Sequence, residues 1–253
     1  MRTLLKCEYL KTRRRFVWLT ALFLSAMMLV WTFHGKYTED MLRWGWMSFL
    51  YQLPLANAIF LPLLAMVVSS RLCDLEHKGV MLKTLAAIAD KGKIYDAKLI
   101  YGMSIMLFQV VLCWVITIFW GGYKGFGGVV PMRLYLLYLL FTIMPTVELY
   151  IFQHTLTLCF KNQAVAFFTG IIGTFCGLFS MFLPQFPWLR KLLFWGHYGA
   201  LQFVGLFGWT QETKYSNAYY AVMEIDWGFF GATIVVCVVM YIVGRVIFVR
   251  EEL

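Results

Sequence analysis

The sequence predicts an all-α, polytopic membrane protein with six transmembrane helices in a single domain that covers residues 1–253. Two observations lead to this prediction. Hydrophobic residues make up 61% of the chain and charged residues only 14%, with a mean hydropathy of +0.72, whereas a soluble domain has roughly 45–50% apolar and about 25% charged residues. The chain also contains six apolar runs of about the 20 residues that cross a bilayer. Lipid is therefore the solvent that accepts the excess apolar surface.

The six runs are separated by shorter segments that carry most of the charge. They cover residues 16–33, 47–68, 99–120, 134–160, 164–183 and 227–249. Pro54, Pro62 and Pro145 lie inside runs and predict kinks, because membrane helices tolerate proline. The first run is longer than the roughly 7–15 apolar residues of a signal peptide, so we interpret it as a retained helix.

The distribution of basic residues predicts the orientation in the membrane. With the N-terminus inside, the inner segments hold fifteen of the 22 Lys and Arg residues and the outer segments hold seven. Basic residues are enriched in cytoplasmic segments, so both termini are expected in the cytoplasm of a multi-pass protein of the cell membrane. The net charge of +9 is then explained by topology, and we expect no nucleic-acid partner.

Three segments between the runs are informative. Residues 1–15 place apolar side chains at helical spacing with basic ones elsewhere, which predicts a helix along the inner leaflet. Residues 71–98 form a charged inner loop, with a helix expected over about 76–89. Residues 184–226 are aromatic but rich in glycine. We expect the last segment to form outer, re-entrant short helices that do not cross; an extra pair of spanning helices is the alternative.

Motifs for catalysis or nucleotide binding are absent from the sequence. There is no GxxxxGK[ST] loop, no GxGxxG after a strand, no HExxH and no GxSxG. The six cysteines lie in apolar or inner segments and form no CxxC pair, so disulfides and zinc sites are not expected. We therefore predict no catalytic, cofactor-binding or metal-binding residue in this chain.

Polar and small residues inside two of the runs have two interpretations each. Glu148 lies near mid-depth of the fourth run, where a carboxylate must face the bundle interior, a partner or water. It is either a contact for a cationic substrate or a structural group at a helix interface. His154 is six residues away and lies on a different helix face, which argues against a proton relay. In the fifth run, Gly170, Gly173 and Gly177 permit close packing, either within one subunit or between two.

Three stretches together resemble a known family. The opening LLKCEYLKTRRRFVWL carries Glu8 and Lys11 before the first run. The inner loop DLEHKGVMLKTLAAIADKGKIYDAKLI has an acidic start, a Lys/Thr-Leu core and Lys98 before the third run. The stretch HTLTLCFKNQAVAFFTGIIGTFCGLF joins the fourth and fifth runs. In order and spacing they resemble the ATP-binding-cassette (ABC) exporter permeases of the second, short class, most closely the lantibiotic-immunity permease subunits. The chain departs from these permeases at 87–91, where AIADK replaces a Leu-Pro-hydroxyl-Arg pattern.

The resemblance covers nearly the whole chain and implies a function. It implies a permease subunit, not itself an enzyme, that expels amphipathic antimicrobial peptides of the lantibiotic or bacteriocin type and so gives immunity or resistance. The implied partners are two copies of an ATP-binding-cassette ATPase, which would bind ATP and magnesium, and a second permease that is related but different. The peptide substrate and the lipid bilayer are the other implied partners.

The resemblance also implies two groups of functional residues. The ATPase-coupling residues would be Glu76, Gly79, Leu82, Lys83 and Leu85. The aromatic outer segment would form part of the exit region, so the candidate substrate path is Trp188, Trp195 and Trp209, together with Glu148, which is a candidate because of its depth in the fourth run.

Two other functions compete with export. A membrane subunit that binds or senses the peptide without transporting it would use the same aromatic outer segment. A channel or secondary carrier that acts alone is the third possibility. Such carriers often contain internal repeats, and we find no convincing repeat between the first three runs and the last three.

Overall fold

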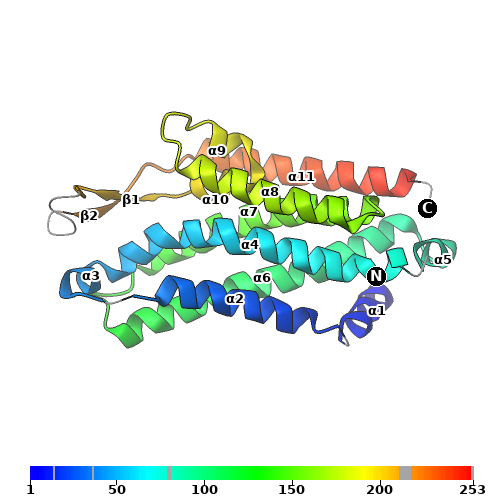
Figure 1. Ribbon diagram of the computed structural model, residues 1–253, viewed down its shortest axis with the longest axis horizontal. Helices are drawn as coiled ribbons and strands as arrows, with labels where there is room; N and C mark the ends of the chain where they lie inside the picture. Colours follow the sequence, from blue (N-terminus) through cyan, green and yellow to red (C-terminus); the bar gives the residue numbers. More distant parts are fainter. Residues whose placement is uncertain (14, 36, 79–80, 211–217, 252–253) are drawn as a thin grey trace.

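The computed structural model describes residues 1–13, 15–35, 37–78, 81–210 and 218–251, without the side chains of residues 40 and 75–78. Long helices run side by side along one axis and make up most of the molecule (Figure 1). They are α2 (Val17–Phe33), α4 (Gly45–Lys78), α6 (Lys91–Lys124), α7 (Met132–Cys159), α8 (Gln163–Met181) and α11 (Trp227–Arg250). The shorter helices are α1 (Arg2–Arg13), α3 (Glu39–Arg43), α5 (Met81–Ile88), α9 (Leu189–Leu192), the 3-10 turn η1 (Phe194–Gly196) and α10 (His197–Ala200).

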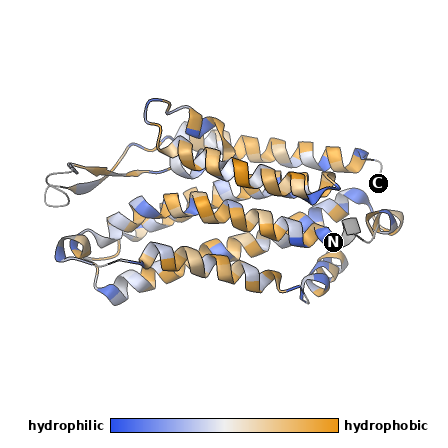
Figure 2. Cartoon of the chain, in the orientation of Figure 1, coloured by the Kyte–Doolittle hydropathy of each residue, from blue (hydrophilic) through white to orange (hydrophobic). Residues whose placement is uncertain are grey.

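The long helices have the length and composition of membrane spans. Within the described residues, five of them are long and apolar enough to cross a bilayer. A sixth span is obtained when α1 and α2, which meet at 70°, are counted as one broken span. Apolar residues fill the middle of the long helices, and polar residues gather toward their ends (Figure 2). The structure thus confirms a mostly helical, multi-pass protein with five or six spans.

The helices on either side of the predicted inner loop are longer than the apolar runs that predicted them. α4 and α6 have 34 residues each, or about 50 Å, so both extend well past a hydrocarbon core of about 30 Å. The helix expected over 76–89 is therefore divided, because α4 continues to Lys78 and only α5 stands apart. Asp90 begins α6 by accepting a hydrogen bond from the backbone N–H of Lys93 at 2.9 Å, as an N-cap residue does.

The two ends of the bundle carry different elements. α1, α5 and both chain termini lie at one end, which we call the α5 end, and α3 and a β-hairpin lie at the other, the hairpin end (Figure 1). The hairpin pairs β1 (Val204–Phe207) with β2 (Tyr219–Val222) in antiparallel register, with Val204 opposite Val222. The all-α prediction missed these strands, because a four-residue apolar run has no periodicity that separates strand from helix.

The segment between α8 and α11 agrees in part with the sequence-based expectation. Its helices α9, η1 and α10 have four, three and four residues. Its described residues contain no extra pair of spanning helices, which removes that alternative for this part of the chain.

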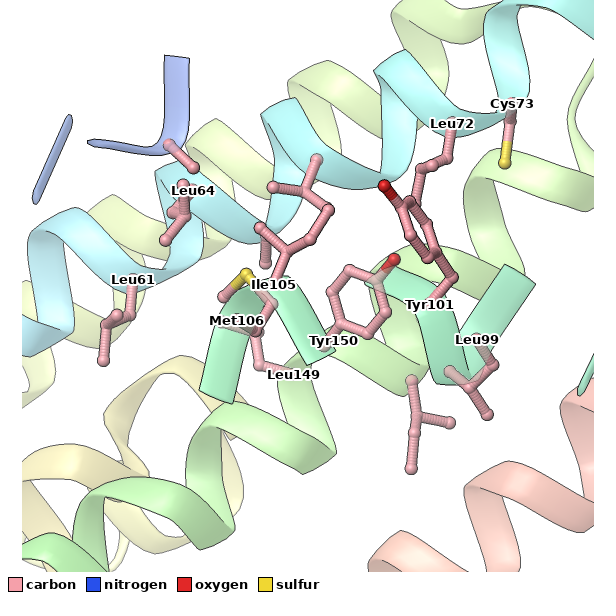
Figure 3. Packing of buried hydrophobic residues seen from close by; sticks show 14 of the residues in the cluster. Leu61, Leu64, Leu72, Cys73, Leu99, Tyr101, Ile105, Met106, Leu149 and Tyr150 are labelled. Atoms are coloured by element: carbon pink, nitrogen blue, oxygen red, sulfur yellow. The ribbon is translucent and has the colours of Figure 1, made fainter. Parts of the chain in front are cut away.

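The core lies where α4, α6 and α7 meet. Leu72 of α4, Tyr101 of α6 and Tyr150 of α7 pack against one another there (Figure 3). Gly102 permits this approach, since a Cβ at that position would overlap the hydroxyl of Tyr150. The outward faces of α8 and α11 expose large apolar side chains instead. Such faces suit lipid, which is as apolar as the side chains themselves.

Candidate coupling and substrate sites

Of the coupling residues predicted from sequence, Leu82, Lys83 and Leu85 lie in α5, and Glu76 lies in the last turn of α4. Leu82 is buried at 7% exposure and packs into the core, whereas Lys83 is exposed and Leu85 is half-buried. Gly79 and the side chain of Glu76 lie outside the described residues. The large apolar side chains that α5 exposes are Met81, at 41%, and Ile88, at 78%.

Sequence reasoning missed Met81 and Ile88 because a short helix with apolar residues on two edges does not reveal which edge is buried. The structure assigns the Leu82 edge to this chain's own core. Met81 and Ile88 therefore form an exposed apolar edge on α5, at an end of the bundle rich in charged residues.

A buried ion pair joins α1 to α6. Lys98 of α6 is fully buried, and its ammonium donates to Glu8 Oε2 at 3.1 Å and to the carbonyl oxygen of Leu72 at 3.0 Å. Glu8 also accepts a hydrogen bond from Lys11 at 2.9 Å. Removing one partner of a buried pair leaves an uncompensated charge and costs about 3–5 kcal/mol. This contact therefore fixes the position of α1 on the bundle.

Three further contacts strengthen the attachment of α1 and the start of α2. The Thr12 hydroxyl lies 2.6 Å from the hydroxyl of Tyr101 on α6, which also accepts a hydrogen bond from Trp18 Nε1 at 3.3 Å. Arg15 pairs with Asp74 of α4 at 3.4 Å. We call these contacts, with the Glu8–Lys98 pair, the α1–α6 latch. The polar face of α1 thus enters the protein, in addition to the lipid-surface role that its sequence predicts.

The first turns of α6 contact three other parts of the chain. They follow α5 in the chain after the N-cap residue Asp90, and the α1–α6 latch joins them to α1. Asp96 accepts hydrogen bonds from Tyr241, at 2.9 Å, and from Arg245, at 3.2 Å, both on α11. The base of α6 thus contacts α1 and α11 and directly follows α5 in the chain.

A second buried polar contact joins α7 to the segment before the hairpin. His197 Nδ1 lies 2.6 Å from Glu148 Oε2, and His197 Nε2 lies 3.0 Å from the carbonyl oxygen of Lys191. A carbonyl oxygen only accepts, so Nε2 carries a proton, and a second proton must lie between Nδ1 and Oε2. The pair is therefore neutral overall, either as carboxylic acid and imidazole or as carboxylate and imidazolium, which suits its burial.

The position of Glu148 limits what it can contact. Its side chain is fully buried, and α10, which carries His197, covers it. A ligand reaches Glu148 only if this segment moves away from α7. His154 lies elsewhere, between the rings of Tyr95 and Tyr150 at 5.1 and 5.9 Å, as the difference in helix face predicts.

The three tryptophans of the predicted substrate path lie in different surroundings. Trp195 is buried against α8, where a Cβ at Gly173 or Gly177 would overlap it. Trp188 and Trp209 are exposed at 58% and 50%. The structure therefore places the buried Trp195 two residues before His197, the partner of Glu148, and leaves the other two tryptophans at the surface.

The glycines of α8 pack within this subunit, which confirms the first of the two interpretations drawn from sequence. Gly173 and Gly177 receive the ring and backbone of Trp195, and Gly170 faces Met66 of α4.

Comparison with protein families identifies the family of this chain. A family model described as ABC-2 family transporter protein matches residues 4–177, which is more than half of the chain. The matched region includes α5, the α1–α6 latch and Glu148, and it ends within α8 before the three tryptophans. A search of curated proteins gave no match.

Proposed function

This chain belongs to the ABC-2 transporter family, and on that premise we propose that it is the permease subunit of an exporter that removes amphipathic antimicrobial peptides from the membrane. A subunit of this family spans the membrane, is not itself catalytic and works with an ATPase partner. The peptide substrate and a role in immunity or resistance rest on the resemblance of the sequence to lantibiotic-immunity permeases. In this proposal the partner ATPase binds ATP and magnesium.

The exposed edge of α5 is the observation that carries the proposal. Met81 and Ile88 form an apolar surface at the end of the bundle that also carries both termini. An ATPase that docks there pushes on α5 when it closes on ATP. The push reaches α1 through the base of α6 and the α1–α6 latch, so that α1 and the start of α2 move with α6. Coupling of this kind uses packed elements with two arrangements, and no chemistry in this chain.

The opposite end of the bundle supports the peptide part of the proposal. The exposed Trp188 and Trp209 lie in the segment between α8 and α11, which includes the hairpin. Aromatic side chains favour the interface between lipid and water, where an amphipathic peptide also resides. We propose that the peptide leaves the membrane past this segment, with both termini of the chain in the cytoplasm and a second permease beside it.

The test of coupling replaces the exposed apolar side chains of α5. In Ile88→Asp and Met81→Asp, a carboxylate at the docking edge should detach the ATPase, while insertion of the chain into the membrane stays intact. The measurement is co-purification of the ATPase with a tagged chain, followed by peptide-stimulated ATP hydrolysis.

Two controls make the result specific. Val129→Asp places the same charge at a 92% exposed position in the α6–α7 connection, at the hairpin end, and should retain the ATPase. Leu82→Asp introduces a carboxylate into the core and should lower the stability of the chain itself. Undiminished co-purification with both α5 variants contradicts the docking proposal. If the ATPase co-purifies but its rate of ATP hydrolysis is the same with and without peptide, the result favours the sensor function instead.

A further inference from the structure

A cavity of about 110 Å³ lies at the hairpin end, between the end of α2, the start of α4 and strand β2. Its lining has two chemical characters. Aromatic rings come from Tyr37, Phe49 and Tyr220, and polar groups come from His34, Ser48 and Gln52. None of the described lining residues carries a carboxylate, an ammonium or a guanidinium group.

The polar side of the cavity is held in place by the chain. Ser48 Oγ accepts hydrogen bonds from Gln52 Nε2 at 2.9 Å and from the Tyr220 hydroxyl at 3.2 Å. The second bond fastens the hairpin to α4. An amide and a hydroxyl fixed in this way offer neutral donors and acceptors beside apolar rings, and such a combination suits an uncharged group with a polar backbone next to it.

A cation lies close to the aromatic side. The ammonium of Lys124 is 4.9 Å from the ring centre of Trp120, 5.6 Å from that of Tyr37 and 5.7 Å from that of Tyr123. The electron-rich faces of the rings attract it. Tyr37 also lines the cavity, so a second cation placed there would be repelled by Lys124 and would lack a described carboxylate to offset the repulsion.

We propose that this cavity receives an uncharged apolar or aromatic residue of the exported peptide, and that Lys124 excludes the peptide's cationic residues from it. The inference rests on the proposed function and adds a rule of specificity to it. A peptide residue fits better than a lipid chain, because peptide amides can use the polar side of the cavity and an acyl chain cannot.

The test uses the purified full transporter in nanodiscs of phosphatidylcholine and phosphatidylglycerol. Two synthetic amphipathic peptides serve as probes, identical except for one residue that is Phe in the first and Lys in the second. Dissociation constants and peptide-stimulated ATP hydrolysis are measured for both.

We expect the Phe peptide to bind more tightly than the Lys peptide. Ser48→Leu fills the cavity and removes the Ser48 hydroxyl. It should weaken binding of the Phe peptide about tenfold, as expected for loss of one apolar pocket. Gln52→Leu changes an exposed side chain, so the fold is kept, and should act in the same direction. Lys124→Met should tighten binding of the Lys peptide about fivefold by removing one like charge. Ser104→Leu, at an exposed site on α6, is the matched control and should change neither value.

The outcomes separate the two proposals. If neither peptide binds or stimulates ATP hydrolysis in the unaltered transporter, the proposed function fails and this inference fails with it. If both peptides stimulate hydrolysis but Ser48→Leu and Gln52→Leu match the control, the inference alone is overturned. It is also overturned if the effect of Ser48→Leu vanishes when the lipid composition is changed, because lipid then occupies the cavity.

Discussion

At the level of single residues, Glu148 and His197 show how one polar contact can attach a surface segment to the centre of a membrane helix. Both side chains are buried, and their shared proton removes the net charge. The geometry favours the structural interpretation of Glu148, because the acid already has a partner within the chain. A substrate contact would first require His197 to leave.

The two interpretations predict different behaviour for two substitutions. In Glu148→Gln, the amide can donate a hydrogen bond to Nδ1 of neutral His197, so we expect little change in stability. In Glu148→Leu, Nδ1 is left buried without a partner, which costs about 1–3 kcal/mol. The measurement is the midpoint of thermal unfolding in detergent. Equal midpoints for Glu148→Leu and the unaltered chain would argue against the attachment described here.

The sequence identifies one half of this contact. A carboxylate in an apolar run has to face the interior, and Glu148 does. Its partner lies 49 residues later in a segment of mixed character, and periodicity carries no information at that separation. The same limit applies to Lys98 and Glu8, which are 90 residues apart: both positions were noted from the sequence, but their pairing comes only from the structure.

At the level of elements, α8 shows how small residues create space for a neighbour. Trp195 occupies the surface that Gly173 and Gly177 leave open, and its ring also packs edge-on against Phe152 of α7 at 5.3 Å. The short helices before the hairpin therefore rest on both α7 and α8.

Filling that space should displace the segment. We expect Gly173→Leu to expel the Trp195 ring and to increase the reactivity of a cysteine placed at Tyr198, which is buried in the unaltered chain at 3% exposure. Ile172→Leu adds no volume and faces outward at 60% exposure, so it serves as the control. Rates of labelling by a maleimide in detergent provide the measurement. Equal rates in the two variants would contradict this packing.

The long helices were predictable because twenty consecutive apolar residues have few alternatives in a bilayer. Their ends were not, because charged residues such as those of 71–78 and 91–98 continue a helix without adding to an apolar run. The hairpin was missed for the opposite reason: its strands are apolar but too short to show a period. The edge of α5 that is exposed depends on tertiary packing, which a local pattern does not contain.

At the level of the whole molecule, both termini lie at the α5 end. The distribution of basic residues predicts that this end faces the cytoplasm, and the proposed docking of an ATPase on α5 requires the same orientation.

Labelling in intact cells tests this orientation. In a chain whose six cysteines have been replaced, Thr3→Cys should be protected from a membrane-impermeant thiol reagent and should react once the cells are permeabilised. Val129→Cys, in the α6–α7 connection at the opposite end, should react in intact cells. The reverse pattern would place the termini outside and exclude docking of a cytoplasmic ATPase on α5.

The α1–α6 latch also sets an order for biogenesis. Glu8 leaves the ribosome 90 residues before Lys98, a delay of roughly 5–20 s at ordinary translation rates of about 5–20 residues per second. During that interval α1 has no partner and can only rest on the lipid surface, for which its basic, amphipathic sequence is suited. When α6 enters the bilayer, the carboxylate of Glu8 has already been synthesised and can pair with Lys98. The first helix synthesised is thus among the last to be fixed in place. Its carboxylate then neutralises Lys98, which would otherwise be a buried charge without a counterion.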